Sequence, residues 1–206
     1  LEEWTEEVHL LHSRYIRRDR NQLEKMIMQF SEDRDVTGIW VTTQLVEASL
    51  DIDFDILYTE MCTADSLLQR MGRCNRKARY QPEEANIIVY ANENGVGDKS
   101  VYGKELYSRS LDKLHQYVGK TLSEKEKIDY INQVYCAEEI MDTSYYKEIE
   151  KYLKHFEELT PLEYSKQETD EKFRNIQSIT VVPDSIYDEN QIIFEKSIEV
   201  LECPHI

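Results

Sequence analysis

The chain lacks any long hydrophobic run: none of its apolar stretches approaches the roughly 18 residues that a membrane-spanning helix needs. Its four cysteines, at positions 62, 74, 136 and 203, are too scattered for a zinc site, and a reducing compartment explains them most simply. The chain also begins without a signal-peptide pattern. These absences predict a cytoplasmic protein with no membrane partner and no bound metal.

Two motifs that nucleotide hydrolysis commonly requires are also missing. The sequence contains no Gly-x-x-x-x-Gly-Lys-Ser/Thr loop, and no Asp-Glu-x-His or similar acidic box follows an apolar strand. It therefore offers no backbone cradle for phosphates and no candidate magnesium ligands. We predict that this chain alone does not hydrolyse ATP.

A positive net charge is absent too, since the formal charge is −16 at pH 7. This balance argues against a plain DNA-binding module, because such modules are usually basic on the face that meets DNA. The charge is uneven, however: residues 1–80 carry −4 and residues 81–206 carry −12. The first part holds two basic clusters, which are Arg14, Arg17, Arg18 and Arg20, and then Arg70, Arg73, Arg76, Lys77 and Arg79.

The second basic cluster has a spacing that suits a polyanion. Gln69, Arg73 and Arg76 are separated by four and then three residues, which on an α-helix would place them on one face. Arginine gives bidentate bonds to phosphate oxygens and stays charged at physiological pH. Gly72 removes a side chain where a backbone or ligand must come close. The alternative is an exposed basic helix that makes weak surface ion pairs.

A second block precedes the arginines and reads as strand, loop, strand. Apolar runs at 38–41 and 54–58 are typical of buried parallel strands, and ligands of such sheets sit at the carboxyl ends of the strands. Thr43 and Gln44 fall at such an end. Asp51, Asp53 and Asp55 alternate beyond it, so some of them face the loop side and can accept hydrogen bonds from a ribose or from arginines. The alternative for these aspartates is turn chemistry and helix capping.

Together these strings resemble a known family. They are HSR at 12–14, TQ at 43–44 with Glu47, SLDIDFD at 49–55, and QRMGRCNR at 69–76. The last string is similar to motif VI of superfamily two helicases. The preceding strings are similar to motif V in the form carried by the CRISPR-associated type I helicase-nuclease that Cascade recruits, whereas DEAD-box relatives would have glycine in place of Ser49. The resemblance covers roughly residues 8–90 and implies a second RecA-like helicase domain.

The resemblance implies a role for each matching residue. Arg73 and Arg76 would act as arginine fingers on the γ-phosphate of an ATP bound between two lobes, with Gln69 beside that phosphate. Asp51 would reach the ribose, and the remaining ATP-contacting positions would be Ser49, Gly72 and Arg70. Contacts to the backbone of single-stranded DNA would come from Ser13, Arg14, Thr43 and Gln44. Arg20 would either touch DNA or brace the domain.

The resemblance also implies partners that this chain does not contain. ATP and Mg²⁺ would be the cofactors, with the magnesium ligands on a first RecA-like lobe. The five histidines lie far apart and no His-Asp pair occurs, so we expect the HD nuclease domain elsewhere, on the same or a separate chain. Cascade and single-stranded DNA would be the other partners. Family members would have an earlier strand and helix, so we expect the chain to start inside the domain or to lack part of it.

The predicted fold class is α/β: a RecA-like parallel sheet flanked by helices, then a mostly helical extension with a small β element. Strands are expected at 8–12, 38–41, 54–58 and 87–90, and the polar loop that follows divides a domain at 1–92 from an accessory region at 93–206. That region should contain helices at 104–117, 123–135 and 138–159 and a hairpin of 177–182 with 191–194. Its many tyrosines are either a base-stacking platform or, as aromatic stripes more commonly are, core and partner contacts.

Two functions from different classes fit these observations. The first is the C-terminal lobe of an ATP-dependent DNA helicase of type I CRISPR interference. The second is a stand-alone, non-catalytic RecA-like adaptor that binds DNA or a protein partner. The intact arginine pair favours the first, because an adaptor has no use for two arginine fingers.

Overall fold

The computed structural model describes residues 8–48, 50–91, 103–157 and 181–202. The chain divides into two compact units, Leu1–Glu150 and Lys151–Ile206. The first unit contains the motif blocks together with the helices up to residue 150. The predicted boundary after residue 92 remains a prediction.

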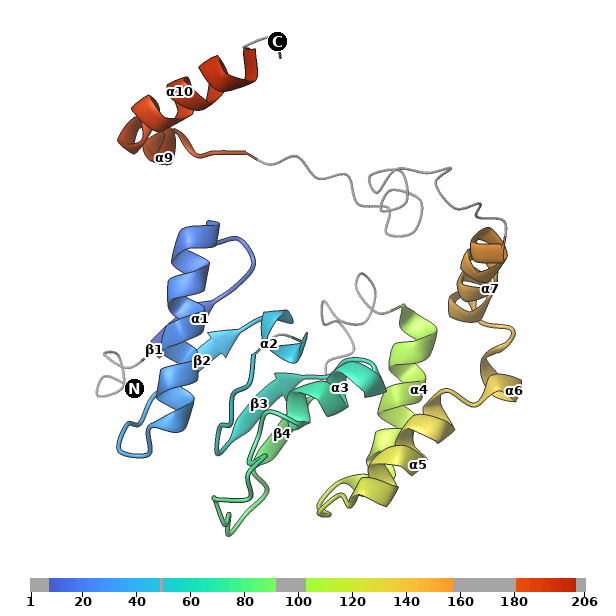
Figure 1. Ribbon diagram of the computed structural model, residues 1–206. Coiled ribbons are helices and arrows are strands. Elements are labelled where there is room, and N and C mark those ends of the chain that lie inside the picture. Colours follow the sequence, from blue (N-terminus) through green and yellow to red (C-terminus); the bar gives the residue numbers. More distant parts are fainter. Residues whose placement is uncertain (1–7, 49, 92–102, 158–180, 203–206) are drawn as a thin grey trace. The chain divides into compact units, whose positions relative to one another are not determined.

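The first unit opens with a strand, a helix and a parallel strand. β1 (Val8–Leu11) pairs with β2 (Ile39–Thr42), with Val8 opposite Ile39 and Leu11 opposite Thr42. The crossover between them is α1 (Arg17–Glu32), as parallel neighbours require a long connection. Figure 1 shows α1 lying along this strand pair. Its buried contacts join Ile27 of the helix to Leu11 of β1.

A second strand pair of the same kind follows. β3 (Leu57–Glu60) pairs in parallel with β4 (Ile87–Tyr90), and α3 (Ala64–Met71) lies between them in the chain. A short helix, α2 (Leu45–Ala48), follows β2. The α/β class with parallel strands is thus confirmed. In the described residues the strands form two separate pairs, β1–β2 and β3–β4.

The third strand differs from its prediction. Phe54 forms only an isolated bridge with Cys74, and the strand itself begins at Leu57. The expected strand at 54–58 was therefore placed about three residues early. Phe54 packs instead against the core beneath α1, with Leu50 and Ile52. An apolar residue at that position serves the core without belonging to the strand.

The helices of residues 104–134 form a bundle on α3. α4 (Lys104–Leu114) runs into the 3₁₀-helix η3 (His115–Tyr117), and α5 (Glu124–Val134) begins with a capping box between Ser123 and Glu126. These bounds agree with the helices predicted at 104–117 and 123–135. The helix predicted at 138–159 is interrupted: α6 (Ala137–Ile140) and α7 (Ser144–Glu157) are separate, and residues 158–159 lie outside the described residues. The Thr143 hydroxyl donates to the Ile140 carbonyl and so closes the turn between them.

The core of this bundle is built on tyrosine. Tyr130 is fully buried, packs edge-on against Tyr117, and donates from its hydroxyl to the Ser110 carbonyl at 2.8 Å. The Ser110 hydroxyl in turn accepts from the backbone N–H of Ala64, the first residue of α3. For Tyr107, Tyr117 and Tyr130, the core alternative is therefore correct and base stacking is not.

The carboxylate of Asp65, on α3, adds a further hydrogen bond between α3 and the end of α5. Tyr135 donates from its hydroxyl to Asp65. Burial opposes ionisation of Asp65, but the hydrogen bonds from Tyr135 and Thr63 outweigh it and hold the pKa of that carboxyl below its usual range. The helices of residues 104–134 thus pack on α3, the helix that leads into Arg73 and Arg76.

The second compact unit is helical in its described part. α9 (Asp184–Glu189) follows Pro183, and α10 (Gln191–Glu202) follows Asn190. The strand predicted at 191–194 is wrong, because these residues form the first turn of α10. A short apolar run such as Ile192 to Phe194 fits a strand or a helix equally well on periodicity alone. Residues 177–180 of the predicted hairpin lie outside the described residues.

Among the helices of the described residues, none combines the length and the hydrophobicity needed to cross a membrane.

Candidate functional site

The two motif blocks meet at a loop that follows α3. The Phe54 N–H donates to the Arg73 carbonyl at 3.0 Å, and the Asn75 N–H donates to the Phe54 carbonyl at 2.7 Å. These bonds form the parallel bridge of Phe54 with Cys74. We define the motif loop as residues 72–77, and it lies directly against residues 51–54.

The motif loop is not helical, which corrects the prediction that Gln69, Arg73 and Arg76 share one helix face. Gln69 lies in α3 with an exposed side chain, but the helix ends at Met71 with Gly72 as its cap. Asn75 adopts a positive φ of 48°, a conformation that asparagine tolerates, and its side-chain amide both donates to and accepts from the backbone of Tyr80. The turn replaces helical spacing and separates the arginines from Gln69.

Gly72 occupies a tight position at the end of α3. A Cβ placed there would lie 3.3 Å from the Leu68 carbonyl oxygen and 3.4 Å from that of Gln69. Its φ is −66°, which any residue can adopt, so a larger side chain there would require only a small shift of the helix end. Contact of Gly72 with ATP remains a prediction.

Arg76 reaches across the loop to the first aspartate. Its guanidinium forms an ion pair with Asp51, and both side chains are well exposed, at 49% and 76%. The two residues that the resemblance assigns to the γ-phosphate and to the ribose are therefore neighbours, on a surface open to solvent.

Asp53 lies two residues after Asp51, but its side chain is buried whereas that of Asp51 is exposed. Only 4% of its side chain is exposed. One carboxylate oxygen accepts the backbone N–H of Arg76 at 2.6 Å, and the other accepts that of Lys77 at 3.2 Å. Arg34, from the loop after α1, places its guanidinium 3.8 Å from the second oxygen. It also donates to Asp55 at 3.0 Å.

Arg70 and Arg73 both hold α2. Arg70 is mostly buried and donates to the Glu47 carboxylate at 2.7 Å and to the Thr59 hydroxyl at 2.9 Å. Arg73 donates to the carbonyls of Val46 at 3.3 Å and Glu47 at 2.9 Å. Carbonyls near a helix C-terminus attract cations, so this arrangement fixes α2 against the end of α3.

The candidates for DNA contact lie at the carboxyl ends of the first strand pair. Ser13 and Arg14 follow β1, and Thr43 and Gln44 follow β2; all four are exposed. Because Leu11 pairs with Thr42, both strands end at the same edge of the sheet. The structure therefore places these four residues at one sheet edge.

Two candidate residues remain, Arg20 and Ser49. Arg20 lies inside α1 and pairs with Glu24 at 3.1 Å, one turn further along the helix. That pairing is consistent with a bracing role. Ser49 lies outside the described residues.

Two buried thiols adjoin the site. Burial raises the pKa of Cys74 to about 11, with the charges of Asp53 and Asp55 adding to the effect. Burial likewise raises the pKa of Cys62 to about 12. Both thiols stay protonated at neutral pH, so neither is a nucleophile at this site.

Sequence reasoning gave no role to two residues that hold the site together, Arg34 and Glu47, and it left Asp53 open as an acceptor for a ribose or for arginines. Glu47 lies in the motif V string, and Asp53 is one of the alternating aspartates, so both were visible as candidates. Arg34 carried no signal, because its link to Asp53 and Asp55 exists only after α1 has turned back on the sheet.

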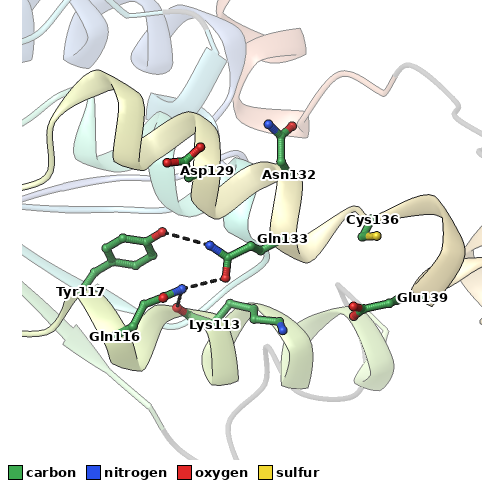
Figure 2. A pocket seen from close by; sticks show the side chains of 8 residues that line it. All are labelled: Lys113, Gln116, Tyr117, Asp129, Asn132, Gln133, Cys136 and Glu139. Atoms are coloured by element: carbon green, nitrogen blue, oxygen red, sulfur yellow. Dashed lines mark hydrogen bonds between the residues drawn. The ribbon is translucent and has the colours of Figure 1, made fainter.

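A shallow hollow of about 500 Å³ lies elsewhere, between α4, η3 and α5 (Figure 2). Gln133 accepts from Gln116 at 2.8 Å and donates to the Tyr117 hydroxyl at 3.3 Å across it. None of the predicted site residues lines this hollow. In the described part of the chain, no three His, Cys, Asp or Glu side chains are grouped so that they could hold a metal ion.

Comparison with known proteins gives a consistent result. Residues 1–79 match the family described as CRISPR-associated nuclease/helicase Cas3, C-terminal. The CRISPR-associated nuclease/helicase Cas3 of Methanothermobacter thermautotrophicus is 33% identical over 197 residues, which cover 90% of this chain and 23% of that protein. The chain thus spans about a quarter of the length of this relative.

Solved structures show the same fold. T. fusca Cas3-AMPPNP is similar with a TM-score of 0.58 and 24% identity, over 89% of this chain and 21% of that one. A chain of a CRISPR RNA-guided surveillance complex, pre-nicking, is similar with a TM-score of 0.55 and 21% identity, over 89% of this chain and 23% of that one.

Proposed function

We propose that this chain, a Cas3 helicase C-terminal region, is the second motor lobe of an ATP-dependent DNA helicase in type I CRISPR interference. In this role it supplies arginines to ATP and backbone contacts to single-stranded DNA. The observation that carries the proposal is the meeting of Arg76 and Asp51 from the two motif blocks. A γ-phosphate and a ribose belong to one nucleotide, so their partners must lie within the length of that nucleotide.

The chemistry of phosphoryl transfer suits these residues. Charge spreads over the oxygens of the transferred group, so catalysis depends on positioning and on charge stabilisation. Arg76 is exposed and charged, and it projects from a loop that is held by several hydrogen bonds. Arg73 lies three positions earlier in the same loop, and Gln69 lies in the last turn of α3. An arginine that reaches ATP from a second lobe makes hydrolysis depend on closure of the two lobes.

The rest of the machinery belongs to other parts of the complete protein. The first RecA-like lobe binds the phosphates and Mg²⁺, which neutralises phosphate charge when bound. Because the sequence has no phosphate-binding loop and no acidic box, we expect the isolated chain to hydrolyse no ATP. The nuclease domain and the surveillance complex are the remaining partners, and the similarity to a chain of such a complex supports the latter.

DNA contacts fall at the edge where β1 and β2 end. Exposed hydroxyls of Ser13 and Thr43, the amide of Gln44 and the guanidinium of Arg14 suit phosphate oxygens. Contacts of this kind position the strand without reading its sequence. A translocating enzyme needs that property, because it must move along any sequence.

Phosphate release by the complete polypeptide, with and without single-stranded DNA, tests the proposal. We compare the wild type with a variant in which Gln69, Arg73 and Arg76 are all alanine. The expected result is that DNA-stimulated hydrolysis falls to background, because the second lobe no longer stabilises the transferred phosphoryl group.

Hydrolysis at the wild-type rate in the triple variant would contradict the motor assignment. A complete polypeptide that binds DNA but never hydrolyses ATP, even as wild type, would favour the adaptor function instead. Circular dichroism of both proteins checks that the variant is folded.

Replacing Arg14 with alanine is expected to weaken binding of single-stranded DNA and to lower its salt dependence. For a single strand, each phosphate that the protein no longer neutralises reduces the slope of log K against log salt by about 0.7. Fluorescence anisotropy with a labelled oligonucleotide at several salt concentrations measures both quantities. Lys125→Ala, at an exposed position of α5, is the matched control. A slope that is unchanged in Arg14→Ala, or equally reduced in the control, would show that Arg14 does not contact the DNA.

A further inference from the structure

Asp53 is a buried acid whose hydrogen bonds all serve one turn. Its carboxylate accepts the N–H of Arg76 at 2.6 Å and that of Lys77 at 3.2 Å. Two consecutive backbone donors that point at one carboxylate fix the orientation of the peptide units between them. The side chain of Arg76 leaves from this fixed backbone.

Arg34 balances the buried charge. Its guanidinium lies 3.8 Å from Asp53 and also donates to Asp55 at 3.0 Å. Charge-assisted hydrogen bonds of a carboxylate are stronger than those of a neutral acceptor. Asp53 therefore restrains the turn more firmly than a neutral amide could, and it does so with only 4% of its side chain exposed.

Asp51 and Asp53 contact different parts of Arg76. Asp51 contacts the guanidinium, whereas Asp53 contacts the backbone N–H of the same residue. The two ends of Arg76 are thus held by two acids that are two positions apart in the chain. A ligand can replace Asp51 at the exposed guanidinium, but it cannot reach the buried backbone contact.

We propose that Asp53 is a positioning residue for Arg76: its buried carboxylate fixes the backbone of residues 76–77 and so sets where the guanidinium meets the nucleotide. This inference rests on the proposed function, because it matters to catalysis only if Arg76 acts on ATP. Asp53 itself does not touch the nucleotide. Its effect therefore falls on turnover and not on binding.

Asp53→Asn in the complete polypeptide tests this role. Asparagine offers one acceptor oxygen and turns an NH₂ group toward the second backbone donor, so one of the two bonds is lost. A misplacement of about 1 Å at a reacting group costs about 100-fold in rate. We expect kcat for DNA-stimulated ATP hydrolysis to fall about 10- to 100-fold. KM for ATP and Kd for single-stranded DNA should each stay within about twofold.

The matched control is Asp55→Asn. Asp55 is half exposed and pairs with the same Arg34, but it bonds to neither backbone donor. This variant should keep wild-type kcat. An unchanged kcat in Asp53→Asn would overturn the proposal. A fall in kcat accompanied by weaker DNA binding and a lower melting temperature would overturn it as well, because that pattern marks a general structural role.

Arg76→Ala, measured in parallel with Asp53→Asn, distinguishes failure of the proposed function from failure of the positioning role of Asp53. Full turnover in Arg76→Ala removes the proposed function. Lost turnover in Arg76→Ala with normal turnover in Asp53→Asn removes only the positioning role.

Crystallography of the wild-type complete polypeptide with AMPPNP gives a test that needs no variant. The proposal requires Asp53 to remain within hydrogen-bond distance of both backbone donors while Arg76 contacts the nucleotide. A structure in which Arg76 reaches the nucleotide only after these bonds have broken would overturn it.

Discussion

Arg76→Ala in the complete polypeptide is expected to lower DNA-stimulated ATP hydrolysis by about 10³- to 10⁵-fold, the range that arginine fingers contribute in phosphoryl-transfer enzymes. The physical reason is the loss of a positive charge from the transition state, where negative charge spreads over the γ-phosphate oxygens. Binding of single-stranded DNA should stay within about twofold, because the DNA candidates lie at the ends of β1 and β2. Phosphate release and fluorescence anisotropy measure the two effects separately.

Arg79→Ala is the matched control for this experiment. Arg79 is also exposed and lies three positions further along the chain. The control should hydrolyse ATP at the wild-type rate. Equal losses in both variants would indicate a general effect of local charge, and unchanged turnover in Arg76→Ala would remove the arginine-finger assignment.

Arg73 and Arg76 differ in what their guanidinium groups contact, so single variants at the two positions test different roles. Its guanidinium donates to the carbonyls of Val46 and Glu47, whereas that of Arg76 is half exposed. Arg73 thus stabilises α2, in addition to the role that the resemblance implies. Of the two arginines, Arg76 is the one whose loss tests phosphate chemistry with least disturbance of the fold.

Tyr130→Ala is expected to have the largest effect on stability, a loss of about 3–5 kcal/mol, which is typical of truncating a large buried aromatic side chain. Tyr130 is fully buried among residues of α3, α4 and α5, namely Ala64, Leu106 and Val134. Its removal leaves a cavity at the point where these helices meet, and it leaves the Ser110 carbonyl without its hydroxyl donor. Burial also raises the pKa of the Tyr130 hydroxyl, so the group remains a donor at any physiological pH.

Pulse proteolysis of the complete polypeptide in urea measures this effect where it occurs, through cleavage products from residues 104–135. Tyr130→Phe is the control that keeps the ring. It should cost about 1 kcal/mol, the net value of one hydrogen bond. A loss below about 1 kcal/mol in the alanine variant would show that these helices do not depend on Tyr130.

The helices of residues 104–134 could be predicted closely because their signals are local. Ser123 and Glu126 form the capping box that their spacing predicts. Apolar residues also recur at helical intervals in the helices before and after this cap. The parallel strands were also accessible, since short apolar runs separated by a helical stretch favour such pairing, although the third strand begins at Leu57 and not at Phe54. The α/β class followed from these patterns.

The C-terminal segment shows where local signals end. Residues 191–194 are apolar and brief, and they can join a strand or a helix with equal ease. Helix α10 extends them by eight residues to Glu202. Its hydrogen bonds continue past the run that suggested a strand, and the length of the element could not be read from the run itself.

The candidate residues for phosphate chemistry, namely the arginines and aspartates of the two motif blocks, could be read from the sequence. Their arrangement depends on the fold. The fold ended α3 at Met71, placed Arg73 and Arg76 on a turn, and buried Asp53 while leaving Asp51 exposed. The physical reason is that Phe54 must pack beneath α1 and pair with Cys74, and these contacts, distant in sequence, outweigh the helical spacing of the arginines.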